Sequence, residues 1–177
     1  MAAEPSPISM LTKNDFSVTD WVTLRDSPYL VGLATLMAGS SGLGTIKESI
    51  AIAQGVMENQ TSAFAFIRDL TSKAEMEAAQ GSLRMMFGGS EGKPSKETLQ
   101  RLALEQVRKS LSLLTGTATT EETDAWRKML YGIAEKVANA AREGGFLGFG
   151  GTLVSEGEQS FLNQLRDTLQ LEQAKKA

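Results

Sequence analysis

Apolar residues recur at intervals of three and four along most of the chain, the spacing that places them on one face of an α-helix. This spacing predicts helices over about residues 17–27, 28–38, 45–59, 62–71, 72–87, 95–115, 119–143 and 155–172. Apolar and polar positions alternate, as in a strand, only over a few residues near Val154. The pattern therefore predicts an all-α fold, a compact bundle of about seven or eight helices.

Capping signals mark where many of these helices begin. An acidic residue follows Ser or Thr by three positions at Ser17–Asp20, Thr45–Glu48, Ser72–Glu75, Thr119–Glu122 and Ser155–Glu158. Pro28 predicts a break, with one helix ending before it and the next beginning at Ser27 as its cap. The apolar residues of 96–115 spread around much of that helix, so we expect it to be the central one.

Composition shifts predict the domain organisation. Residues 1–16 are polar, contain two prolines and show no period, which is typical of a flexible leader. Residues 17–177 then form a single helical domain. Glycine, serine and proline gather in 88–95, a linker that we expect to join two subbundles, 17–87 and 96–174.

An internal repeat is one interpretation of two similar segments. Residues 33–56 and 133–165 share an order: apolar helix, glycine-rich loop, Ser or Thr cap, Glu three positions later, apolar helix. Two pseudo-repeated helix-loop-helix units would produce this order. Convergence on the ordinary rules of helix capping would produce it as well, and the sequence leaves both open.

Charge and composition exclude several function classes. The chain has 18 Lys and Arg against 21 Asp and Glu, so it lacks the basic excess that nucleic acid selects. It has no cysteine and no histidine, which removes thiol chemistry, the commonest general base and the usual zinc ligands. We therefore predict a chain that is not an enzyme and that uses no cofactor.

No segment is typical of a membrane span or a secretory signal. The longest nearly apolar runs, 29–39 and 144–154, are about half the roughly 20 residues that a spanning helix requires. The first residues lack the basic and apolar regions of a signal peptide. A cytoplasmic protein without membrane insertion is the prediction that follows.

The glycine-rich segment 144–151 (GGFLGFGG) is the strongest candidate for a binding site. Its apolar side chains could form an exposed contact surface for a partner protein, which makes the candidate partner-binding residues Gly145, Phe146, Leu147, Gly148, Phe149 and Gly150. Alternatively, its amides could hold an anion at the start of the last helix. A third interpretation is a helix end followed by a tight connection whose Phe and Leu fill the core.

Three glutamates beside the glycine-rich loops are candidate metal ligands: Glu48, Glu156 and Glu158. Without His or Cys, the metal would be a hard ion such as Ca²⁺ or Mg²⁺ bound through oxygen. Capping and compensation of the helix dipole explain the same glutamates without any metal.

The stretch 134–165 (AEKVANAAREGGFLGFGGTLVSEGEQSFLNQL) resembles the C-terminal signature of an uncharacterised group of bacterial proteins. The arrangement is similar, more distantly, to the all-helical tellurite-resistance TerB-like family. In that family a short loop, typically containing Asp-Gly, leads into a helix that opens with an acidic residue. Neither loop of this chain contains Asp-Gly. The resemblance implies a fold and an association with stress rather than an activity.

The leading functional hypothesis is a non-catalytic protein-interaction or adaptor domain that binds another protein through residues 144–151. The alternative is a carboxylate-based protein that binds a divalent cation or a small ligand at the two loop-helix junctions. The sequence also leaves a homo-oligomer open.

Overall fold

The structure, a computed structural model, describes residues 11–39, 46–88, 94–143 and 154–171. These residues form seven α-helices and two short 3-10 helices, and no strand occurs among them. The α-helices are α1 (Val18–Ala38), α2 (Ile46–Met57), α3 (Ala65–Leu70), α4 (Lys73–Phe87), α5 (Lys96–Leu114), α6 (Thr120–Glu143) and α7 (Glu156–Leu169); the 3-10 helices are η1 (Lys13–Asp15) and η2 (Glu58–Thr61). The predicted all-α class and helix number are confirmed.

Most of the predicted caps are present. A serine hydroxyl accepts a hydrogen bond from the amide three residues on at the start of four helices, at Ser17, Ser72, Ser95 and Ser155. At the start of α6, Thr119 and Glu122 exchange hydrogen bonds as the capping box predicts. The predicted cap at Thr45 lies outside the described residues.

The break predicted at Pro28 is wrong, because α1 is one helix of 21 residues that passes through the proline. Proline in a helix interior costs about 3 kcal/mol, since it lacks an amide and crowds the preceding turn. The proline removes the amide that would bond to the Leu24 carbonyl, four residues earlier. Side chains bond to the preceding carbonyl, that of Thr23, which accepts from Ser27 Oγ at 2.7 Å and from Gln106 Nε2 of α5 at 3.0 Å. Burial of α1 among its neighbours offsets the cost of the proline.

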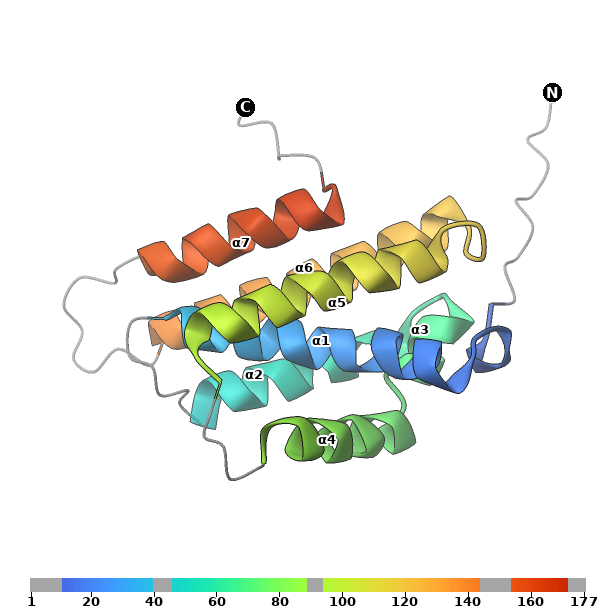
Figure 1. Cartoon of the computed structure of the whole chain (residues 1–177), viewed down its shortest axis with the longest axis horizontal. Helices are drawn as coiled ribbons and strands as arrows, with labels where there is room; N and C mark the ends of the chain where they lie inside the picture. The colour runs from blue at the N-terminus through green and yellow to red at the C-terminus, as the bar shows by residue number, and fades with distance from the viewer. Residues whose placement is uncertain (1–10, 40–45, 89–93, 144–153, 172–177) are drawn as a thin grey trace.

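The central helix is α1, and the prediction that 96–115 would be central is wrong. α1 contacts α2, α4, α5, α6 and α7, and Figure 1 shows it running through the middle of the molecule. It buries polar side chains as well as apolar ones, among them Thr23, Arg25, Asp26, Ser27 and Thr35. On α5, by contrast, Leu102, Leu111 and Leu113 are only half-buried. The number of apolar residues alone therefore underestimated how completely α1 is surrounded, because α1 also buries polar side chains.

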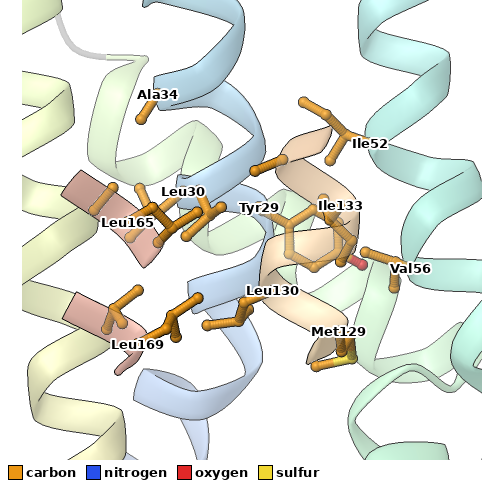
Figure 2. Close-up of a cluster of buried hydrophobic side chains, with 14 of the residues drawn as sticks. Tyr29, Leu30, Ala34, Ile52, Val56, Met129, Leu130, Ile133, Leu165 and Leu169 are labelled. Atoms are coloured by element: carbon orange, nitrogen blue, oxygen red, sulfur yellow. The ribbon is translucent and has the colours of Figure 1, made fainter. Parts of the chain in front are cut away.

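One core joins helices from both halves of the chain. Figure 2 shows part of it, with side chains from α1, α2, α6 and α7: Tyr29, Leu30, Ala34, Ile52, Val56, Met129, Leu130, Ile133, Leu165 and Leu169. The largest side chains that are fully buried include Trp126, Phe66 and Phe161. Because α1 packs most extensively on α5, and α2 on α6, helices before and after residues 88–95 share this core.

Candidate functional site

The residues predicted to bind a partner, Gly145, Phe146, Leu147, Gly148, Phe149 and Gly150, lie outside the described residues, as does the side chain of Glu48. The elements that flank residues 144–153 are described. α6 ends at Glu143 before them, and Ser155 caps α7 after them. The described structure therefore gives the two helix ends that border this segment in the sequence.

The ends of three helices meet at one end of the bundle. Lys96 Nζ, in the first turn of α5, donates a hydrogen bond of 3.0 Å to the carbonyl of Ala38, the last residue of α1. Gly157 of α7 packs on the same carbonyl, and a Cβ on Gly39 would lie 3.3 Å from Oε1 of Glu158. We call these residues the junction: Ala38, Gly39, Lys96, Gly157 and Glu158. In the sequence, Gly39 begins the first glycine-rich segment, and Gly157 lies six residues after the second.

Glu158 is a capping residue of the junction. Its side chain is buried, and Oε2 accepts hydrogen bonds from the amide of Ser155 at 2.8 Å and from its hydroxyl at 2.7 Å. Glu156, two positions earlier, is exposed, as expected for residues that do not share a helix face. Within the described part of the chain, no three acidic residues are close enough to hold a metal ion. The two described glutamates thus do not form a shared site.

A groove runs between α2 and α6. One part has a volume of about 640 Å³ and is lined by polar and small side chains, including Gln54, Gly132, Glu135 and Asn139. The other part, of about 270 Å³, continues past Gly132 to Lys128. Ile50 is 48 % exposed and lines the groove at the start of α2. The groove is open, so it presents a surface rather than an enclosed cavity.

The sequence contained a signal for this groove that the helical periodicity did not use. Gly132 lies in the middle of α6, where a glycine costs about 1 kcal/mol relative to alanine. A glycine at such a position calls for a structural or functional reason. The ion pair between Lys136 and Glu58 beside the groove could not be seen in the sequence. The two residues meet only in the folded chain, where Nζ of Lys136 lies 2.5 Å from Oε1 of Glu58.

A buried charge network ties η1 and α4 to α1. Asp26 is 1 % exposed and accepts hydrogen bonds from Arg25 Nε at 2.7 Å and from Ser82 Oγ of α4 at 2.6 Å. Glu75 of α4 accepts from Lys13 Nζ at 2.5 Å and lies 3.7 Å from Nη1 of Arg25. The two carboxylates, of Asp26 and Glu75, neutralise the two cations, of Arg25 and Lys13. The network therefore holds the helices together with its charges paired.

Burial and charge shift the pKa of several groups around the core. Burial, with the negative charge of Asp26, raises the pKa of Tyr29 to about 12, and the positive charge of Arg25 offsets part of this. Burial also acts to raise the pKa of Glu75, but hydrogen bonds, chiefly from Lys13, outweigh it and leave that pKa below its ordinary value. Burial raises the pKa of Tyr131, whose hydroxyl bonds to Arg166. None of these groups lines the groove between α2 and α6.

Comparison with known proteins finds no family model that matches the chain, and no curated protein or solved structure with significant similarity to it. The resemblance to the TerB-like family therefore stays a prediction. Among the described residues, none of the helices is both long enough and apolar enough to cross a membrane. Fold and site geometry thus define an all-α bundle with a helix-end junction and a neighbouring open groove.

Proposed function

We propose that the chain is a non-catalytic protein-interaction or adaptor domain that binds a partner protein at the junction end of the bundle. The observation that carries this proposal is the close approach of Gly39, directly after α1, to Glu158 in the first turn of α7. Binding residues are found disproportionately on loops that a rigid scaffold positions. The partner would contact Phe146 and Phe149, and the TerB-like resemblance suggests that this partner acts in a stress response.

The chemistry of the described surface supports binding rather than catalysis. The groove between α2 and α6 is lined by Ile50 of α2 and Ala140 of α6, and Figure 1 shows α6 ending at the end of the bundle where α7 begins. Its lining combines small, amide and charged side chains. Such a surface can add contact area to a partner held by the glycine-rich segments.

The test uses the double variant Phe146→Ser, Phe149→Ser. Tagged wild-type chain is used to capture and identify a partner, and the purified partner is then titrated against the variant. We expect binding to be lost while helical content and melting temperature stay unchanged. Val18→Ser is the matched control, since Val18 is 83 % exposed at the start of α1, away from the junction, and should bind normally. Retained binding, or loss of helical content in the double variant, would contradict the proposal.

A further inference from the structure

A row of three residues on α6 faces solvent and lines the groove. Lys128, Gly132 and Glu135 are all exposed, and their spacing of four and then three positions places them on one helix face. We call them the α6 row. A Cβ on Gly132 would meet no atom within 4 Å, so the surface above it is open. The row therefore has a positive end, a flat centre and a negative end.

The two charges of the row have no ion-pair partner among the described residues. The neighbouring Lys136, in contrast, is paired with Glu58 across the groove at 2.5 Å. The other ion pairs of the described chain also leave Lys128 and Glu135 out. One positive and one negative side chain thus remain available to a binding partner, separated along the helix by about 10.5 Å.

This charge pattern is complementary to itself. If a second α6 runs antiparallel across the first, Lys128 of each copy lies opposite Glu135 of the other, and the midpoint falls beside Gly132. A two-fold interface requires this reciprocity, in which one residue contacts a second and the second contacts the first. We infer that two copies of this chain associate through the α6 row, with Gly132 against Gly132 and two intermolecular ion pairs.

The shape of the surface fits a second copy at this place. Gly132 lines both parts of the groove, so the absence of a side chain allows two helices to approach closely. Ile50 of α2, which lines the groove, is 48 % exposed and supplies apolar area at the side of the contact. The net charge of −3 is small enough that two copies repel each other only weakly. The contact occupies the middle of α6 and leaves the junction free.

Cysteine cross-linking tests the two-fold contact directly, because the chain has no cysteine of its own. Gly132→Cys should form a disulfide-linked dimer under mild oxidation at micromolar concentration, since a disulfide requires Cα atoms within about 7 Å. Gly81→Cys is the matched control. Gly81 is also an exposed helical glycine with open space above it, on α4. Equal cross-linking of the two variants would overturn the proposal.

Charge reversal tests the ion pairs. Sedimentation velocity over a range of concentrations should show that wild-type chain dimerises. Lys128→Glu and Glu135→Lys should each weaken the dimer about tenfold or more, because each creates like-charge contacts. The double variant should recover the wild-type affinity, and all four affinities should converge at high salt. A monomeric wild type, including one that binds only a different protein on this face, or a double variant as weak as the single ones, would overturn the proposal.

Discussion

Gly157, in the first turn of α7, lies so close to Ala38 at the end of α1 that a Cβ at position 157 would come within 2.3 Å of the Ala38 carbonyl oxygen. Lys96 Nζ donates to the same oxygen and would lie 2.8 Å from that Cβ. The contact allows α7 to begin directly on the end of α1, where the amino group of Lys96 also offsets the negative end of the α1 dipole. A residue with no side chain is therefore required here by packing.

Gly157→Ala should destabilise the protein. The added methyl group must displace backbone at the junction, and such overpacking typically costs about 1–3 kcal/mol. Chemical denaturation followed by circular dichroism measures this change in the free energy of unfolding. Gly81→Ala, at an open helical position, should instead stabilise the chain by up to about 1 kcal/mol. If both substitutions act alike, the close contact at Gly157 is not what determines its effect.

Asp26→Ala should be more damaging than the loss of any surface ion pair. Removing Asp26 leaves the Arg25 side chain, 10 % exposed, with only the more distant Glu75 carboxylate at 3.7 Å, and breaking a buried ion pair costs about 3–5 kcal/mol. Glu58→Ala provides the comparison, because its side chain is 63 % exposed and its pair with Lys136 should contribute less than about 1 kcal/mol. Equilibrium denaturation should show a clearly larger loss in the free energy of unfolding for Asp26→Ala than for Glu58→Ala. Similar losses for the two variants would mean that burial does not determine the contribution of the network.

The depressed pKa of Glu75 predicts a contribution to acid stability. In the unfolded chain this carboxyl takes up a proton near its ordinary pKa of 4.5, whereas in the folded chain it does so only at lower pH. Its stabilisation is therefore present above pH 4.5 and is lost as the pH falls through the folded-state pKa. Glu75→Gln should reduce stability at pH 7 and make the melting temperature less dependent on pH between 5 and 3. If the melting temperatures of wild type and Glu75→Gln changed equally with pH, Glu75 would not contribute to acid stability.

Tyr29 should produce the opposite behaviour at alkaline pH. Its hydroxyl is buried and has no hydrogen-bond partner among the described residues, and its pKa is about 12 when folded against 10.0 ordinarily. The neutral form is favoured by folding, so stability is complete below pH 10 and falls as the pH rises toward 12. Tyr29→Phe should leave stability at pH 7 within about 1 kcal/mol of wild type and should flatten this alkaline loss. A large loss at pH 7 would show that the hydroxyl has a partner in solution.

Local signals predicted much of the fold correctly. Five of the helix starts depend on a hydroxyl and an amide three residues apart, an interaction contained within one turn of chain. The continuity of α1 through Pro28 could not be predicted in this way, because α1 is buried by helices far along the chain, such as α5, whose Gln106 lies 83 residues from its partner Thr23. Burial of Arg25 and Asp26 likewise depends on partners in α4, namely Glu75 and Ser82.

The candidate sites depend on the fold more than on any motif. The glycine-rich segment at 144–151 was evident from sequence, but only the fold shows that Gly39, directly after α1, lies close to Glu158 of α7. The α6 row is spaced regularly in the sequence, yet its exposure requires knowing that α2 and α1 cover the other faces of α6. Sequence periodicity identifies the faces of a helix; tertiary contacts decide which face stays open.

The central place of α1 has a consequence for the order in which the protein is made. Ser27 of α1 bonds at 2.8 Å to Ser110 of α5, 83 residues later. At typical rates of translation, α1 is synthesised roughly 4 to 17 s before the part of α5 that covers it. Throughout that interval α1 lacks α5, on which it packs most extensively, together with α6 and α7, so part of its apolar surface stays uncovered and open to chaperones. The helix made first in this domain is thus among the last to be buried.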